Sequence, residues 1–306
     1  MKTMNLGKSN LKVPRVAIGC MRINSMNIEE LAEYIKFCVD NGLNFFDHAD
    51  IYGRGECERL FGKALKLSGI KREDIVIQSK CGIVPEKMYD FSKEYIIKSV
   101  DEILERLDID YLDILVLHRP DVLVEPEEVA EAFEILHSSG KVRYFGVSNH
   151  KPSQIELLKK YLKQDLLVNQ LQFSLPFSNM IASGMEVNML TDGSFDRDGS
   201  VLDYCRLHDM TIQAWSPFQY GFFEGVFIGS EKYPELNKNL EELAKKYGIT
   251  PTGIATAWIL RHPAKIQMIA GTTKISRLQE IIDGSKVTLS REEWYKLYLS
   301  AGHILP

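Results

Sequence analysis

The chain has 306 residues, of which 45% are hydrophobic and 26% charged, which is the composition of an ordinary globular protein with a sizeable core. Its net charge of −5 gives no indication of a nucleic acid or an anionic membrane surface as a partner. No apolar run reaches the roughly 18–20 residues that cross a bilayer.

Two further features point to the cytoplasm. Residues 1–14 alternate polar and apolar side chains and lack the apolar core of a signal peptide. The five cysteines are odd in number, scattered and without a C-x-x-C pair. Disulfides and a thiolate metal site are therefore not expected, and we predict a cytoplasmic protein.

Short apolar runs alternate with amphipathic segments along the chain. In the first half, this pattern predicts strands at 16–20, 43–47, 75–80 and 112–118, and helices at 28–42, 56–67, 93–106 and 127–138. In the second half, it predicts strands at 142–148, 166–173, 211–215 and 266–270, and helices at 152–162, 201–206, 235–247, 252–261, 277–283 and 291–300. The polar stretch 174–199 is expected to be irregular.

The sequence thus contains eight predicted strands, each apolar at consecutive positions and followed by a helix. This pattern is typical of a closed (β/α)₈ barrel or of an open doubly wound sheet. The open sheet would need a glycine-rich phosphate turn after an early strand, and residues 21–24 after the first strand read Met-Arg-Ile-Asn. The sequence thus favours an α/β fold of the TIM-barrel type, forming one domain over residues 1–306. Residues 5–13 are expected to form a short N-terminal hairpin at the bottom of the barrel, and extra helices close the C-terminal end.

Functional residues of such barrels lie where the strands end. Here Asp47, Lys80 and His118 end three consecutive strands, and Tyr52 follows Asp47 closely. Later strands end in Ser148-Asn149, Gln170, Trp215-Ser216-Pro217 and Gly271-Thr272-Thr273. Each residue alone could serve as a turn, a packing group or a solvated charge, but their convergence on one barrel mouth favours an active site.

The four residues make chemical sense together. A buried Lys80 next to Tyr52 stabilises the phenolate and is expected to lower the pKa of the phenol from about 10. Asp47 can pair with Lys80, and His118 can donate a hydrogen bond to the oxygen that Tyr52 protonates. The set lacks a nucleophile, so the other reactant must come from outside, and a hydride from a nicotinamide fits.

Four ordered segments stand out, namely Asp47–Gly53 (DHADIYG), Gln78–Gly82 (QSKCG), Asp110–Asp113 with Leu117–Pro120, and Gly140–Arg143 with Gly146–Asn149. In residue type and order these segments resemble the aldo-keto reductases, bacterial members in particular. The resemblance runs from about Leu11 to the C-terminus. It implies that Tyr52 is the general acid, that Lys80 and Asp47 tune it, and that His118 orients the carbonyl group.

The resemblance also implies a cofactor site. Ser148, Asn149 and Gln170 would hold the nicotinamide carboxamide, and Trp215 would stack on its ring. Further cofactor contacts are expected from Gly19, Met21, Arg22, Ser216, Pro217, Phe218, Gly271, Thr272, Thr273, Lys274, Arg277 and Glu280. The cations Lys274 and Arg277 favour NADP(H) over NAD(H), since they suit a 2′-phosphate. Ile281 stands where the family often has an asparagine for the adenine, which leaves the adenine contacts open.

The resulting hypothesis is NADPH-dependent reduction of a small aldehyde or ketone by a monomer or small homo-oligomer, with no metal. One alternative is an NADP(H)-binding, redox-sensing or regulatory subunit with little turnover. Another is a barrel metal hydrolase that uses His48, Asp50 and His118 as ligands. The substrate loops are expected at 82–91, 174–199 and 219–234, together with the C-terminal tail.

Overall fold

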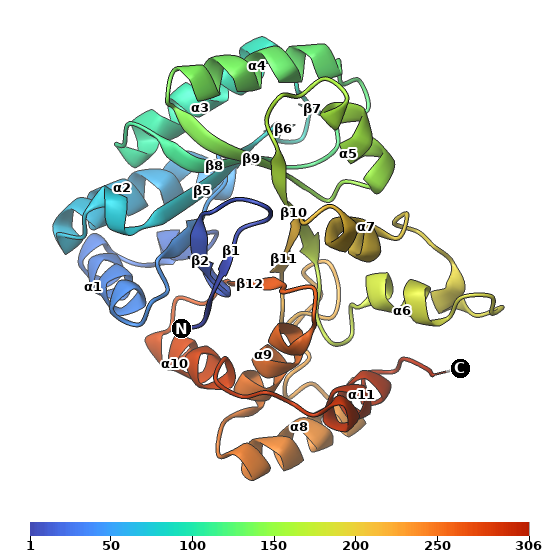
Figure 1. The fold of residues 1–306 in the computed structure, drawn as a ribbon. Coiled ribbons are helices and arrows are strands. Elements are labelled where there is room, and N and C mark those ends of the chain that lie inside the picture. Colours follow the sequence, from blue (N-terminus) through green and yellow to red (C-terminus); the bar gives the residue numbers. More distant parts are fainter. Residues whose placement is uncertain (306) are drawn as a thin grey trace.

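The computed structural model describes residues 1–305 and is built around eight parallel strands that close into a barrel (Figure 1). The strands are β3 (Val16–Gly19), β4 (Phe45–Asp47), β5 (Val76–Cys81), β8 (Leu112–Leu117), β9 (Val142–Ser148), β10 (Leu166–Gln172), β11 (Thr211–Trp215) and β12 (Gln267–Ala270). Each pairs with the next in this order, and β12 pairs with β3 to close the ring. The predicted (β/α)₈ barrel is confirmed.

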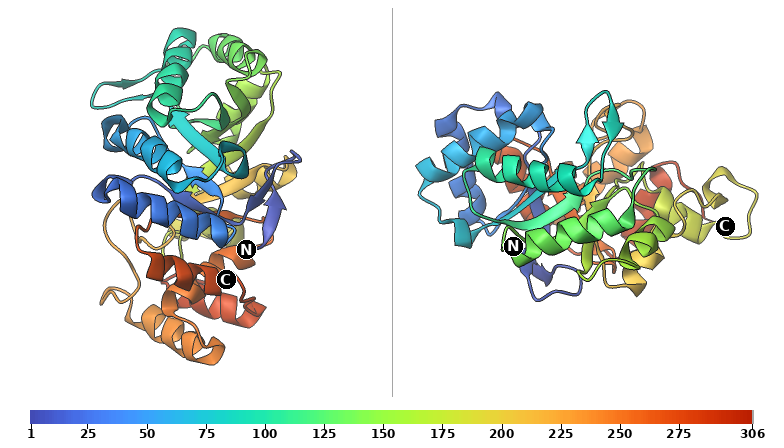
Figure 2. Two further views of the ribbon diagram at one scale, coloured as in Figure 1. Left: turned by 90° about the vertical axis from the view of Figure 1, so that its left-hand side faces the viewer. Right: turned by 90° about the horizontal axis from the view of Figure 1, so that it is seen from above.

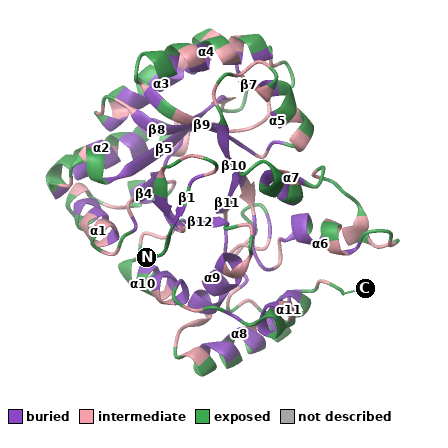
Figure 3. Ribbon diagram, viewed as in Figure 1, coloured by how far each residue is buried: buried purple, intermediate pink, exposed green. Residues whose placement is uncertain are grey.

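Helices surround the barrel and bury their apolar faces against the strands or against one another (Figure 3). They are α1 (Ile28–Asp40), α2 (Glu56–Ser68), α3 (Lys93–Leu107), α4 (Pro126–Ser138), α5 (Pro152–Lys159), α7 (Val201–Leu207), α8 (Pro234–Tyr247), α9 (Pro251–Arg261), α10 (Ile275–Gly284) and α11 (Arg291–Ser300). Sequence-local signals start several of them. The side chain of Asn27 accepts from the Glu30 amide at 2.8 Å, while Glu30 accepts from the Asn27 amide at 3.0 Å. This reciprocal cap explains why α1 begins at Ile28.

Two segments expected to be loops contain regular structure. The stretch 174–199 includes helix α6 (Asn179–Met185), and 82–91 includes a hairpin of β6 (Ile83–Val84) and β7 (Met88–Tyr89). The prediction for 174–199 was therefore wrong over α6. This helix has only seven residues, among them Ser183 and Gly184, so it carries too little apolar periodicity to be recognised from the sequence.

An N-terminal hairpin closes one end of the barrel, as predicted, although it spans β1 (Thr3–Asn5) and β2 (Lys12–Pro14) rather than 5–13. Its Leu6 is fully buried and packs in one cluster with the residues of the barrel interior. The amide of Gly7 donates to Thr211 Oγ1 at 2.8 Å. Gly7 has φ +54°, and a Cβ there would meet the Leu167 carbonyl oxygen at 2.7 Å. Only glycine fits this contact.

The two ends of the barrel therefore differ. Figure 2 shows the β1–β2 hairpin at one end and the β6–β7 hairpin at the other. The first end is closed by apolar packing, which leaves the carboxyl ends of the strands for the functional site. No helix in residues 1–305 combines the length and the apolar character needed to cross a bilayer.

Candidate active site

Lys80 joins the predicted catalytic residues at the carboxyl end of the barrel. It is fully buried on β5, and its Nζ lies 2.8 Å from the carboxylate of Asp47 on β4. The same Nζ donates to the carbonyl oxygen of His48 at 2.6 Å and to Tyr52 Oη at 3.2 Å. An ammonium group has three donors, so these three acceptors satisfy it. The rings of Tyr52 and His118 lie 6.2 Å apart, edge to face.

The charges around Tyr52 act differently from the prediction. Burial raises the pKa of Tyr52 above its ordinary value, and the ammonium of Lys80 offsets this only in part. The expectation of a lowered Tyr52 pKa was therefore wrong, because desolvation outweighs the cation. Burial also acts to lower the pKa of Lys80, but the charges and hydrogen bonds of Asp47 and Tyr52 raise it above its ordinary value. Lys80 is thus a cation and Tyr52 a protonated phenol at neutral pH.

A chain of buried amides supports Asp47 from below. Asp47 Oδ1 accepts from Gln78 Nε2 at 2.6 Å and from Gln170 Nε2 at 3.1 Å. Both amide groups also donate to Gln213 Oε1, at 2.9 and 3.1 Å. Gln213 Nε2 in turn donates to Gln267 Oε1 at 2.8 Å, and Gln267 Nε2 donates to the Pro14 carbonyl at 2.7 Å. A backbone carbonyl can only accept, so Pro14 sets the direction in which the amides of Gln267 and Gln213 point. We call Gln78, Gln170, Gln213 and Gln267 the amide relay.

A cavity of about 630 Å³ opens above these residues. Its walls include Asp47, Tyr52 and His118, whereas Lys80 lies beneath the wall. Most predicted cofactor residues also line the cavity, namely Gly19, Met21, Arg22, Ser148, Asn149, Gln170, Trp215, Ser216, Pro217, Phe218, Gly271, Thr272, Thr273, Lys274 and Arg277. Glu280 lies one turn beyond Arg277 on α10, outside the residues that line the cavity.

The side chains at the ends of β9 and β11 hold one another in place. Asn149 has a positive φ of 61°, its Nδ2 donates to Ser148 Oγ at 2.7 Å, and its Oδ1 accepts from Trp215 Nε1 at 3.2 Å. Ser148 Oγ donates to the Gln170 carbonyl at 2.9 Å. Gln170 Nε2 donates hydrogen bonds to Asp47 and Gln213, so Gln170 Oε1 is left to accept a hydrogen bond from a ligand. These amide and hydroxyl groups, with the flat ring of Trp215, fit a nicotinamide carboxamide and its ring.

Sequence reasoning missed part of the cavity wall. Arg119, the residue after His118, lines the cavity, as do Ile51, Gly53, Thr252 and Ile269. Of the predicted substrate loops, 82–91 supplies Ile83, and 219–234 supplies Gln219, Phe222, Phe223, Val226 and Ile228, whereas 174–199 supplies no wall residue among those described. Arg119 could have been found from its place at the end of β8, the signal that identified His118.

The structure does not assemble the alternative metal site. Within residues 1–305, no group of three or more histidine, cysteine, aspartate or glutamate side chains could hold a metal ion. Both ring nitrogens of His48 are buried without a hydrogen-bond partner, and its ring packs edge to face on Phe61 at 4.5 Å. His48 is therefore a packing residue.

The arrangement can protonate a carbonyl oxygen. Tyr52 holds a proton next to a cation, and His118 faces the same cavity. A nicotinamide, when bound, supplies or accepts a hydride. The chain itself then orients the carbonyl group and delivers the proton.

Comparison with known proteins identifies the family of the chain. The model of the aldo/keto reductase family matches residues 15–298. The chain is 37% identical to the uncharacterized oxidoreductase YcsN of Bacillus subtilis over 97% of each chain, and 33% identical to a 6-dehydroglucose reductase of Agrobacterium fabrum over 95% of each. It is also similar to a thermostable aldo-keto reductase solved with the inhibitor epalrestat, with a TM-score of 0.77 and 27% identity over 98% of this chain and 100% of that one. The chain therefore belongs to the aldo/keto reductase family and is an NAD(P)H-dependent oxidoreductase that reduces carbonyl compounds.

Proposed function

We propose that this protein uses NADP(H) to reduce small aldehydes or ketones to alcohols, with Tyr52 as the general acid. One observation carries the proposal: the Lys80 ammonium, satisfied by Asp47 and the His48 carbonyl, donates its third hydrogen bond to a phenol that opens into the cavity. The free, buried state of all five cysteines suits a reducing compartment, and we place the reaction in the cytoplasm.

Tyr52, Lys80 and His118 have different roles in the reaction. Tyr52 donates its proton to the carbonyl oxygen as that oxygen gains negative charge, and Lys80 stabilises the phenolate that results. Burial, and then the charges of Lys80 and Arg119, hold the pKa of His118 well below its ordinary value, so its ring is neutral. His118 Nδ1 is buried without a partner, so the ring proton belongs on Nε2, from which it can be donated to the same oxygen.

Support for NADP(H) comes from the far end of the cavity. Lys274 precedes α10, and no side chain caps the first amides of this helix. Lys274 and Arg277 both line the cavity there. Uncapped helix amides beside two cations suit a phosphate group, and the 2′-phosphate distinguishes NADPH from NADH.

The test is the oxidation of NADPH and NADH with a panel of aldehydes, by wild type and by Tyr52→Phe. We expect turnover by the wild type with a lower KM for NADPH than for NADH, and a loss of about 10²–10⁴-fold in kcat in the variant. Unchanged kcat in Tyr52→Phe would overturn the role of the phenol. Cofactor binding without turnover of any aldehyde would instead favour a regulatory subunit.

A further inference from the structure

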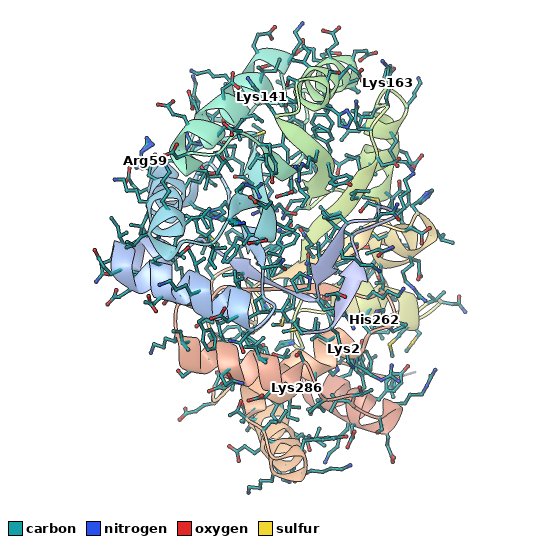
Figure 4. The ribbon with its side chains drawn as sticks, turned by 60° about the vertical axis from the view of Figure 1, so that its left-hand side comes forward. Lys2, Arg59, Lys141, Lys163, His262 and Lys286 are labelled. Atoms are coloured by element: carbon teal, nitrogen blue, oxygen red, sulfur yellow. The ribbon has the colours of Figure 1, made fainter. Side chains whose placement is uncertain are left out.

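The cavity carries positive charge although the whole chain has a net charge of −5. Four cations line it, namely Arg22, Arg119, Lys274 and Arg277, whereas Asp47 is its single carboxylate and is paired with Lys80. Two cations outside the cavity are instead paired with acidic side chains. Arg59 and Lys163 project from the outside of the molecule (Figure 4) and each has an acidic neighbour, Glu56 at 3.3 Å and Glu134 at 3.6 Å.

Arg119 is the cation that lies beside the reacting groups. It follows His118 at the end of β8, is half-buried, and has its guanidinium carbon 6.0 Å from the centre of the Phe222 ring. No carboxylate of residues 1–305 forms an ion pair with it. Other partly buried arginines have partners: Arg72 lies 2.6 Å from Asp113 and Arg106 2.7 Å from Glu58, while Arg15 and Arg261 donate to backbone carbonyls.

A guanidinium that has lost part of its water without gaining an anion is unfavourable unless a ligand supplies one. Its planar fork matches a carboxylate or a phosphate with two parallel hydrogen bonds. The cofactor phosphate already has Lys274 and Arg277 at the other end of the cavity. Arg119, next to His118, is therefore placed for an anionic group on the substrate itself.

We propose that the substrate is a carbonyl compound that also carries a carboxylate or a phosphate group, and that Arg119 binds this group. The proposal rests on the proposed function, because it names the substrate class of the same site. Phe222, which is 62% exposed, packs edge to face on Trp215 at 6.1 Å and lies beside the Arg119 guanidinium, so its ring borders the place where the anion would bind.

Matched pairs of aldehydes test the proposal. We would compare kcat/KM for 4-formylbenzoate and its neutral methyl ester, and for glyceraldehyde 3-phosphate and glyceraldehyde. The first pair tests carboxylate recognition, and the second tests phosphate recognition. The proteins are wild type, Arg119→Leu and Arg119→Lys, with Arg59→Leu as a control that removes the same charge outside the cavity.

We expect the wild type to prefer the anionic member of at least one pair. Arg119→Leu should reduce that preference by about 10–100-fold, the effect of losing a hydrogen-bonded charge pair. Arg119→Lys should restore part of it, and Arg59→Leu should leave it unchanged. Added salt should weaken the preference in wild type, since ion pairing is screened.

Two results would overturn the proposal. One is an anion preference that is absent in wild type or unaffected by Arg119→Leu. The other is a rise in the KM for NADPH with an unchanged anion preference in Arg119→Leu, which would assign Arg119 to the cofactor. Failure of the proposed function looks different, because the wild type would then turn over none of the four aldehydes.

Discussion

At the scale of single residues, burial keeps the Tyr52 phenol protonated, so that it donates a proton rather than accepts one. Its pKa is raised chiefly by desolvation, with Lys80 opposing the shift. A raised pKa keeps the phenol protonated to a higher pH than in water. The free enzyme is thus prepared to donate a proton, which is what reduction requires.

This gives a prediction for the pH dependence of activity. The kcat/KM for aldehyde reduction should stay level from about pH 6.5 upward and fall only above about 10, the ordinary pKa of tyrosine. Alcohol oxidation needs the phenolate, so its kcat/KM should rise over the same range. Measuring both directions between pH 6 and 10.5 checks this. A reduction rate that falls with an apparent pKa near 7 would contradict it.

No acidic limb should come from His118 in this range, because its pKa lies well below the ordinary value. The matched control is Tyr52→Phe, whose residual rate should lose the alkaline limb altogether. A limb that survives in the variant would belong to another group.

At the scale of the secondary structure elements, the amide relay links four strands beneath the site. Gln78 lies on β5, Gln170 on β10, Gln213 on β11 and Gln267 on β12, and their hydrogen bonds cross the interior of the barrel. The relay ends at Pro14 on the N-terminal hairpin. The hairpin thus contributes to the position of Asp47 at the opposite end of the barrel.

Gln213→Met tests this link, because methionine has a similar size but lacks the amide. Gln213 does not contact Asp47, yet the variant should lower kcat about tenfold more than it changes KM, since Gln78 and Gln170 lose their common acceptor. The alkaline limb of the pH profile should move to higher pH, because a less firmly held Asp47 supports the charge of Lys80 less well, and that charge opposes the raised pKa of Tyr52. The free energy of unfolding should fall by about 1–3 kcal/mol as buried amides lose partners.

Asn239→Leu is the matched control. Asn239 is also a buried amide, but it lies on α8 and faces Glu235 rather than the barrel interior. The free energy of unfolding of Asn239→Leu should fall, while its kcat and its pH profile stay as in wild type. Equal behaviour of the two variants in kcat would show that the relay has only a structural role.

The elements also show what the sequence can and cannot predict. Apolar runs located all eight strands, and their ends identified Asp47, Lys80 and His118, because parallel strands bring these ends together. The amide relay was not predicted, because a glutamine inside an apolar strand does not reveal which amide it faces across the barrel. The sign of the Tyr52 pKa shift was also missed, since it depends on burial that exists only after folding.

At the scale of the whole molecule, buried histidines make stability depend on pH. Burial lowers the pKa of His48 to about 3 and those of His150 and His262 to about 4, and that of His118 lies well below its ordinary value. In the unfolded chain each histidine takes up a proton near pH 6.5. The stability that these groups contribute is therefore present above about pH 6.5 and is lost as the pH falls toward their folded values.

One neighbouring carboxyl acts in the opposite direction. Burial, with the charge of Glu58, raises the pKa of Asp50 to about 7. In the folded protein Asp50 stays protonated up to about pH 7, whereas in the unfolded chain it loses its proton at a lower pH. The stability that Asp50 contributes is therefore lost as the pH rises toward 7. Together, these four histidines and Asp50 contribute an uptake of about three protons on unfolding near pH 5.5, and each proton is worth about 1.4 kcal/mol per pH unit.

The free energy of unfolding, measured by urea titration between pH 5 and 8, should therefore fall steeply below pH 6.5. Two neighbouring substitutions should change the slope with opposite signs. His48→Phe removes one group that takes up a proton on unfolding, so it should flatten the slope by about one proton. Asp50→Asn removes the opposing group and should steepen it by about as much. Slopes that shift in the same direction in both variants would contradict this account, because desolvation acts in opposite senses on an imidazole and on a carboxyl.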